Sequence, residues 1–152
     1  TAYDKLQTFV PIQEYQIDYY KNKFLKYINP GFIKCVTDEN DELVAFAITM
    51  PSFSNALKKI NGKVDFFGKL RLLHAKNFNH KGSLYLIGVR PDFQNKGVIA
   101  ILFNELQKFY NKFGITEVET NPELIENTAI QQLWKNYENN QHKNRATFTK
   151  QI

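Results

Sequence analysis

The feature that most constrains the fold is a strand-like segment followed by a glycine-bearing turn and an amphipathic segment. Leu84–Val89 is almost continuously apolar, which is typical of a strand whose two faces are both covered. After the turn, apolar residues recur at helical spacing, and Gly114 is suited to end the helix. They are Val98, Leu102, Leu106, Phe109 and Phe113. The chain therefore contains a strand–turn–helix unit that must pack in layers.

The segments before this unit also alternate between helical and extended patterns. Helical spacing of apolar residues predicts a helix over Ile12–Ile28, with Ile17, Tyr20, Phe24, Tyr27 and Ile28 on one stripe. Phe32–Thr37 and Leu43–Thr49 flank the polar sequence DENDE and predict an antiparallel hairpin. In the next stretch Ser52 or Ser54 is suited to cap a helix that Gly62 ends. A further helical piece carries Phe66, Phe67, Leu70 and Leu73.

The end of the chain continues the alternation. Ile115–Thr120 predicts a strand, a helix opens at Asn121 or Asn127 and runs through Tyr137, and Arg145–Ile152 predicts a last strand. Strands and helices that alternate in this way predict a layered α/β or α+β fold with a mixed sheet.

Composition limits the classes of protein. A chain of 152 residues is about one domain, and 43% hydrophobic with 23% charged residues excludes a disordered chain. The net charge is +5, but the lysines are scattered, which indicates a solvated surface. Aromatic residues are not interleaved with basic ones in any strand, so we expect no nucleic-acid partner.

Cys35 is the only cysteine, so no internal disulfide can form, and its apolar neighbours predict a buried, inert thiol. No apolar stretch approaches the roughly 20 residues that span a bilayer, and no secretory leader is visible. We therefore expect a cytoplasmic protein with no membrane partner. Because the chain opens with Thr1 and not with methionine, we expect a piece of a longer protein.

The turn Gln94–Ile99, with the sequence QNKGVI, has two interpretations. Gly97 either eases a tight connection or lets an anion approach the free amides at a helix start. The helix dipole adds positive charge there, and we expect Arg90 and Lys96 to be mobile cations at the rim. The pattern is neither a P-loop nor the dinucleotide fingerprint. The turn alone leaves both interpretations open.

Two motifs carry a resemblance to a known family. LYLIGVRPDFQNKGVIAILFNELQKF resembles the acyl-CoA-binding motif of the GNAT acyltransferase superfamily, which runs Val-x-Pro, Gln or Arg, two residues, Gly, one residue, Gly or Ala. Val89, Pro91, Gln94 and Gly97 match in register, whereas Ile99 departs from the last position. ENTAIQQLW is similar to the second motif of that family, with Asn127 and Trp134 in its two marked places.

The resemblance implies a mixed, mostly antiparallel twisted sheet flanked by helices. It is nearest to a bacterial two-lobed subgroup of GNAT-like proteins, in which such a region forms the C-terminal half. Residues 1–152 would then be a single GNAT-like acyl-CoA-binding domain, a C-terminal fragment whose partner is the missing N-terminal lobe.

The resemblance also implies roles for individual residues. Acetyl-CoA or CoA would be the acyl donor, and an amine of a small molecule or peptide the acceptor. The backbone of Ile87, Gly88 and Val89 would pair with the pantetheine arm. Gln94 would position the loop, and Asn127 would bond the cofactor from the other side. The pyrophosphate would lie on the amides of Asn95, Lys96, Gly97, Val98 and Ile99.

Acid and base residues are less clearly marked. Trp134 stands where the family often has a tyrosine, and an indole is no proton donor at ordinary pH. Tyr137, Tyr85 and Glu119 are the catalytic candidates, although each residue type at such a position is more often structural. His74 and His80 lack a matching cysteine or carboxylate pair, so we expect no metal.

Two functions remain open from the sequence. The first is an acyl-CoA-dependent N-acyltransferase, foremost an acetyltransferase, which Gln94, Gly97 and Asn127 favour. The second is a non-catalytic GNAT-like domain that binds a ligand or packs against its missing half, which Trp134 and Ile99 favour.

Overall fold

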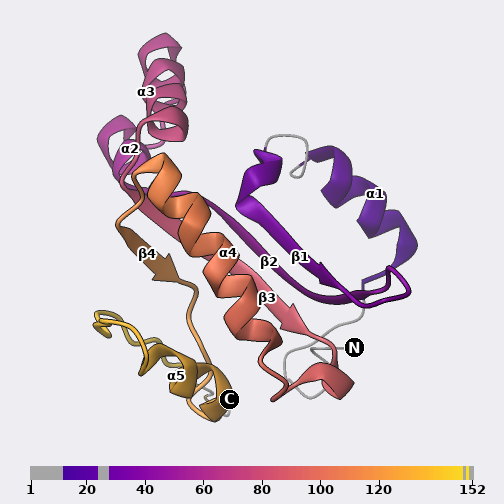
Figure 1. Cartoon of the computed structure of the whole chain (residues 1–152). Coiled ribbons are helices and arrows are strands. Elements are labelled where there is room, and N and C mark those ends of the chain that lie inside the picture. Colours follow the sequence, from indigo (N-terminus) through magenta and orange to yellow (C-terminus); the bar gives the residue numbers. More distant parts are fainter. Residues whose placement is uncertain (1–11, 24–27, 149, 151–152) are drawn as a thin grey trace. The chain divides into compact units, whose positions relative to one another are not determined.

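A computed structural model describes residues 12–23, 28–148 and 150 (Figure 1). The chain forms two compact units, residues 1–119 and residues 120–152. In chain order the elements are α1 (Glu14–Lys23), η2 (Pro30–Phe32), β1 (Ile33–Thr37), β2 (Leu43–Pro51), α2 (Ser54–Ile60), α3 (Phe66–Asn77), β3 (Lys81–Val89), η3 (Pro91–Phe93), α4 (Val98–Phe113), β4 (Glu117–Thr120) and α5 (Thr128–Trp134).

The sheet has the strand order β1-β2-β3-β4. β1 pairs antiparallel with β2 and β2 pairs antiparallel with β3, so that Cys35 lies opposite Phe46 and Ala47 lies opposite Ile87. α4 connects β3 to β4 along one side of the sheet (Figure 1). The predicted class, a mixed and mostly antiparallel sheet flanked by helices, is confirmed.

The core lies between α4 and the sheet. Leu102 and Leu106 of α4 are each 1% exposed, and Thr49 of β2 is fully buried beneath the helix. The Thr49 hydroxyl donates a hydrogen bond of 2.8 Å to the backbone oxygen of Phe32, and the Phe32 ring meets that of Phe109 edge to face at 4.8 Å. The predicted α4 stripe thus builds the core through Leu102 and Leu106, whereas Phe113 at its end is 45% exposed.

The hairpin between β1 and β2 closes where the sequence predicts it. One carboxylate oxygen of Asp38 accepts hydrogen bonds from the backbone N–H groups of Asn40, at 2.9 Å, and Glu42, at 3.1 Å. Asp41 adopts the left-handed φ of 61°, which aspartate tolerates better than most residues. Asp38 therefore fixes the shape of this turn.

Two expectations about burial are wrong. The pairing of β2 with β3 shifts between Ile48 and Thr49, which makes Tyr85 the extra residue of a bulge. Tyr85 and Leu86 are consequently 40% and 48% exposed, so β3 is not covered on both faces. Cys35 is also exposed, because it shares a sheet face with Phe46 and not with the residues that α4 covers.

Several predicted boundaries also need correction. Among the described residues the first helix spans Glu14–Lys23, with Ile17 and Tyr20 exposed and Ile28 outside any helix, while Phe24 and Tyr27 lie outside the described residues. The N-cap of α2 is Phe53 and not Ser52 or Ser54. The C-cap is Asn61, so the helix ends before Gly62. Strand β1 begins after Phe32, and β4 begins after Thr116. The last helix covers only Thr128–Trp134.

The predicted strand Arg145–Ile152 is not found. Its residues 145–148 and 150 have no regular secondary structure, and the remaining ones lie outside the described part of the chain. Alternating apolar residues are sparse there, so the sequence offers little to pair with a sheet.

Candidate functional site

The turn that follows β3 has an unusual backbone. After η3, residues 94–97 form a turn that leads directly into α4. Asn95 has a φ of 61° and Gly97 a φ of 76°, so both lie in the left-handed region. Glycine enters this region freely and asparagine does so more readily than most residues. The sequence asparagine-lysine-glycine is therefore what this turn requires.

The amides of the turn have no partners in the part of the chain that the structure describes. Within the described residues, the backbone N–H groups of residues 95–99 donate no hydrogen bond. The flanking N–H groups of Gln94 and Ala100 donate to the backbone oxygens of Pro91 and Gly97. A Cβ built on Gly97 would meet no heavy atom within 4 Å. A run of unpaired donors at an open helix start fits an anion such as a diphosphate.

Gln94 links the turn to the strand before it. Its side-chain nitrogen donates a hydrogen bond of 3.4 Å to the backbone oxygen of Val89, the last residue of β3. This contact closes the turn onto the strand end and agrees with a positioning role for Gln94.

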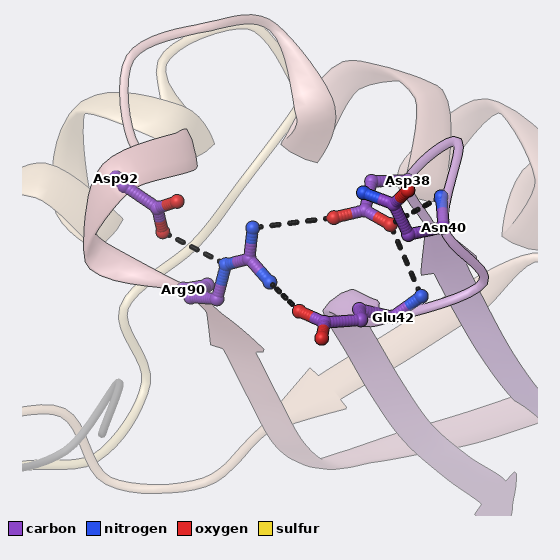
Figure 2. Close-up of polar contacts among 5 residues, drawn as sticks. All are labelled: Asp38, Asn40, Glu42, Arg90 and Asp92. Carbon is purple, nitrogen blue, oxygen red and sulfur yellow. Dashed lines mark hydrogen bonds and ion pairs between the residues drawn. The ribbon is translucent and has the colours of Figure 1, made fainter.

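Arg90 lies at the centre of a carboxylate cluster (Figure 2). Its guanidinium donates to Asp92 at 2.9 Å, to Glu42 at 3.1 Å and to Asp38 at 3.3 Å. The hydrogen bond to Asp92 is the main cause that raises the pKa of Arg90 above its ordinary value. Arg90 is thus a structural cation, and the expectation that it is mobile at the rim of the turn is wrong.

Asp38 receives its charge stabilisation from two sources. Backbone N–H groups of Glu42 and Asn40 hold the pKa of Asp38 below its ordinary value of 3.8, and the nearby Arg90 lowers this pKa further. The cluster therefore ties the β1–β2 hairpin to the start of the turn. No local sequence pattern predicts the contact of Arg90 with Asp38 and Glu42, because this contact depends on the strand register.

Lys96 is a second cation beside the turn. Its ammonium lies 5.1 Å from the centroid of the Phe93 ring, and the Arg90 guanidinium lies 4.6 Å from the same centroid. In the part of the chain that the structure describes, Lys96 forms no ion pair. Its charge adds to that of the helix start.

The strand residues predicted to face the cofactor lie at the end of β3 next to the turn. Ile87, Gly88 and Val89 pair with Ala47, Phe46 and Ala45 of β2 on one side. On the other side β4 has four residues against nine in β3, and its segment is hydrogen-bonded to the backbone oxygen of His80. β4 is therefore too short to pair along the whole of β3.

The catalytic candidates divide between the two units. Tyr85, at the bulge of β3, and Glu119, in β4, belong to the first unit. Tyr137 belongs to the second, in which Asn127 precedes α5 without a side-chain cap. There the Trp134 indole donates to both carboxylate oxygens of Glu123, at 2.9 and 3.0 Å. The roles of all these predicted site residues, in both units, stay predictions.

The described residues contain neither a side-chain cluster that could hold a metal ion nor a helix that could cross a membrane. Among the described residues, no group of three or more histidine, cysteine, aspartate or glutamate side chains is placed to hold a metal ion. No described helix has both the length and the apolar character needed to cross a membrane.

Comparison with known protein families identifies the family of the chain. Residues 2–137 match the family model described as "Acetyltransferase (GNAT) family". The chain belongs to the GNAT acetyltransferase family. The match extends across both compact units and confirms the resemblance that the two motifs indicate. A search of curated proteins gives no match.

Solved structures with the same fold include three aminoglycoside acetyltransferases. The 6'-N-acetyltransferase AAC(6')-IG from Acinetobacter haemolyticus has a TM-score of 0.58 at 14% identity, over 94% of this chain and 85% of that chain. AAC(6')-Ih from Acinetobacter baumannii has a TM-score of 0.54 at 11% identity, over 95% and 84%. The enzyme meta-AAC0020 from an uncultured soil metagenomic sample, in complex with sisomicin, has 0.50 at 11%, over 97% and 79%. These likenesses show the fold.

Proposed function

We propose that this GNAT family member is an acyl-CoA-dependent N-acyltransferase, foremost an acetyltransferase. The observation that carries the proposal is the run of unpartnered backbone amides at residues 95–99, in a turn that Gly97 leaves open. The family match supports acyl-CoA as the ligand of this turn. Exposed donors at a helix start, next to a glycine without a side chain, are accessible to an anionic ligand.

Binding divides between the turn and the strand beside it. The amides of residues 95–99 hold the diphosphate of the acyl donor, and Lys96 adds a positive charge. The end of β3, at Ile87–Val89, pairs with the pantetheine arm through its backbone. Gln94 keeps the turn attached to Val89, and the resemblance of the second motif supports Asn127 as a further residue that bonds the donor.

The chemistry is a direct transfer. The amine nitrogen of the acceptor forms a bond to the acyl carbon, the bond between that carbon and the thiol sulfur breaks, and the amine proton passes to the leaving thiolate. Tyr85, Glu119 and Tyr137 are the candidates that relay this proton, directly or through water. A backbone amide of β3 stabilises the charge that develops on the carbonyl oxygen. Cys35 is not required, because no covalent intermediate forms.

The acceptor is an amine of a small molecule or a peptide. The neighbour meta-AAC0020 was solved with sisomicin, which supports an amine-bearing class without selecting one compound.

One observation favours a second function, a domain that binds the ligand without catalysis. The Trp134 indole stands at the position where the motif often has a tyrosine, and it is held by Glu123. If neither Tyr85, Glu119 nor Tyr137 relays the proton, binding persists and transfer does not.

Isothermal titration with acetyl-CoA and with CoA tests the binding step. We expect the wild-type chain to bind both ligands and the variant Gly97→Trp to bind neither. Gly114→Trp is the matched control, because Gly114 has a similar left-handed φ at the other end of α4 and equally open surroundings. Loss of binding in both variants, or no binding by a folded wild-type chain, would exclude the turn as the donor site.

A transfer assay separates the two functions. Amine-dependent release of CoA is followed by chromatography, because the exposed Cys35 would consume a thiol reagent. Release that depends on an added amine supports the enzyme. If the chain binds acetyl-CoA but releases no CoA with any amine, the non-catalytic alternative is supported. Unchanged acetyl-CoA binding by the variants Tyr85→Phe, Glu119→Gln and Tyr137→Phe would agree with it.

A further inference from the structure

The positive charge of the chain is concentrated in one segment. Residues 52–81, which contain α2 and α3, hold seven lysine and arginine residues and one aspartate, a net charge of +6. The whole chain carries +5, so the remainder has a net charge of −1. The basic segment lies at the end of β3 opposite the turn (Figure 1). A strand of nine residues separates the two by about 30 Å.

This segment contains an open cavity of about 670 Å³. Such a volume is within the range of small-molecule sites, roughly 300–1,000 Å³. Apolar side chains of Ala56, Phe67 and Leu70 line it together with the basic side chains of Lys59, Arg71 and His74, and no aspartate or glutamate does so. The cavity therefore combines an apolar wall with positive charge.

The positive charges of the cavity are not neutralised by the described protein. In that part of the chain neither Arg71 nor Lys59 forms an ion pair, and Arg71 donates only a long hydrogen bond of 3.5 Å, to the backbone oxygen of Lys59. Two carboxylates of this region have other partners. Asp65 accepts from the backbone N–H of Gly68 at the start of α3, and Glu117 pairs with Lys81.

One wall of the cavity is held by hydrogen bonds. The Asn79 amide donates to the backbone oxygen of Ser52 at 2.5 Å and accepts from the backbone N–H of Lys81 at 3.0 Å. The N–H of Ser52 donates to the oxygen of Lys81 at 2.8 Å. These bonds fix the end of β2 against the start of β3, so this part of the cavity is formed before any ligand binds.

The apolar side chains of the cavity are exposed to solvent, and a bound ligand would cover part of their surface. Phe67 is 69% exposed and Leu70 is 48% exposed. Each contact with an apolar chain removes part of this surface from water, which contributes about 25 cal/mol per Å² buried. An acidic head group would at the same time meet Arg71 and Lys59.

We propose that the cavity between α2 and α3 binds a monomeric anionic amphiphile, a molecule with an apolar chain that ends in a carboxylate. The apolar chain lies on Phe67, Leu70 and Ala56, and the carboxylate meets Arg71 and Lys59. This site is separate from the turn at Gly97 and does not depend on the proposed acyl transfer.

Calorimetric titration with decanoate tests the proposal, with decylamine and acetate as matched ligands, all below their micelle concentrations. Decanoate has both the chain and the negative charge, decylamine has the same chain with a positive charge, and acetate has the charge alone. We expect decanoate to bind the folded chain about tenfold or more tightly than either. Equal binding of decanoate and decylamine, or no binding of decanoate, would overturn the proposal.

Variants locate the site on the chain. Arg71→Glu and Phe67→Ser should each weaken decanoate binding about tenfold, and both positions are exposed, so the fold should persist. Lys112→Glu on α4 is the control, because it changes the net charge as much as Arg71→Glu does and lies outside the cavity. An equal effect of Lys112→Glu and Arg71→Glu would show attraction to net charge and would overturn the site.

A last arm separates the cavity from a flat surface. If the protein binds phosphatidylglycerol vesicles but no monomeric decanoate, the segment is a membrane-facing surface and the cavity proposal is wrong. Acetyl-CoA binding is measured on the same variants and should be unchanged, so failure of this proposal and failure of the acyl-transfer proposal are distinguishable.

Discussion

The guanidinium of Arg90 lies 3.3 Å from the carboxylate of Asp38, although 52 residues separate them in the sequence. Asp38 shapes the β1–β2 hairpin through the N–H groups of Asn40 and Glu42, and Arg90 follows β3 directly before the turn that carries the unpartnered amides. The hairpin is thus attached to the candidate donor site. The cluster gives the turn a fixed starting point without contributing a free charge to it.

Replacing Arg90 should therefore loosen the turn. We expect Arg90→Ala to weaken acetyl-CoA binding several-fold and to lower the melting temperature by a few degrees, because three carboxylates lose a shared partner. Arg90→Lys should restore only part of the effect, since one ammonium cannot reproduce the forked contacts of a guanidinium. Titration calorimetry and thermal melts measure both quantities. If Lys112→Ala, a change on α4 away from the cluster, had the same effect, the contacts of Arg90 would not explain it.

The Asp38 carboxylate should make the stability depend on pH in the acid range. Its pKa in the folded protein is below the ordinary value of 3.8, so the unfolded chain binds the proton first as the pH falls. The contribution is complete above the unfolded pKa and disappears as the pH falls through the folded pKa. Denaturant melts of wild type and Asp38→Asn should diverge above about pH 4 and converge below it. Glu105 and Glu117 also have lowered pKa values, but they titrate in both proteins and cancel in the difference.

Two glycines at the ends of α4 offer a matched comparison. Gly97 and Gly114 have φ values of 76° and 68°, and a Cβ at either would meet open space. Alanine at each should cost about 1–2 kcal/mol of folding free energy, through the left-handed backbone alone. Only Gly97→Ala should also weaken acetyl-CoA binding, because its methyl group occupies the approach to the amides. Equal losses of binding in the two variants would mean that strain, and not the methyl group, is responsible.

The extent to which the sequence predicts this fold follows from how local each signal is. The α4 stripe of Leu102 and Leu106 and the hairpin turn at Asp38 are determined by neighbours a few residues away, and both are confirmed. The bulge at Tyr85 depends on how β2 and β3 are paired. The two strands are far apart in the sequence, so no short segment of it predicts their register. The same is true of the exposure of Cys35, which depends on which sheet face α4 covers.

The candidate site divides in the same way. Gly97 and the helix start after it are visible in the sequence because glycine and amphipathic spacing are local features. The left-handed Asn95 is a weaker signal of the same kind. The role of Arg90 could not be predicted, since its partners Asp38 and Glu42 are brought near it by the strand register. The cavity beside α3 requires the packing of two helices against strand ends, and the excess charge of its segment is missed because its lysines stand singly or in pairs without a basic run.

Tyr110 of α4 offers a final test of the core. Its hydroxyl is buried and has no hydrogen-bond partner among the described residues. Burial is the main cause that raises the pKa of Tyr110 above its ordinary value. The nearby Thr49 hydroxyl offsets part of this shift, although the two do not meet with hydrogen-bond geometry.

Removing the unpartnered hydroxyl should be neutral or stabilising, and we expect Tyr110→Phe to gain up to about 1 kcal/mol in the free energy of unfolding. Thr49→Val is the contrasting variant, since it deprives the buried oxygen of Phe32 of its donor at 2.8 Å and should cost about 1–3 kcal/mol. Urea titrations of the three proteins measure both changes. A clear loss of stability in Tyr110→Phe would show that the hydroxyl has a partner in solution, such as an ordered water, and that the polar group contributes to this core.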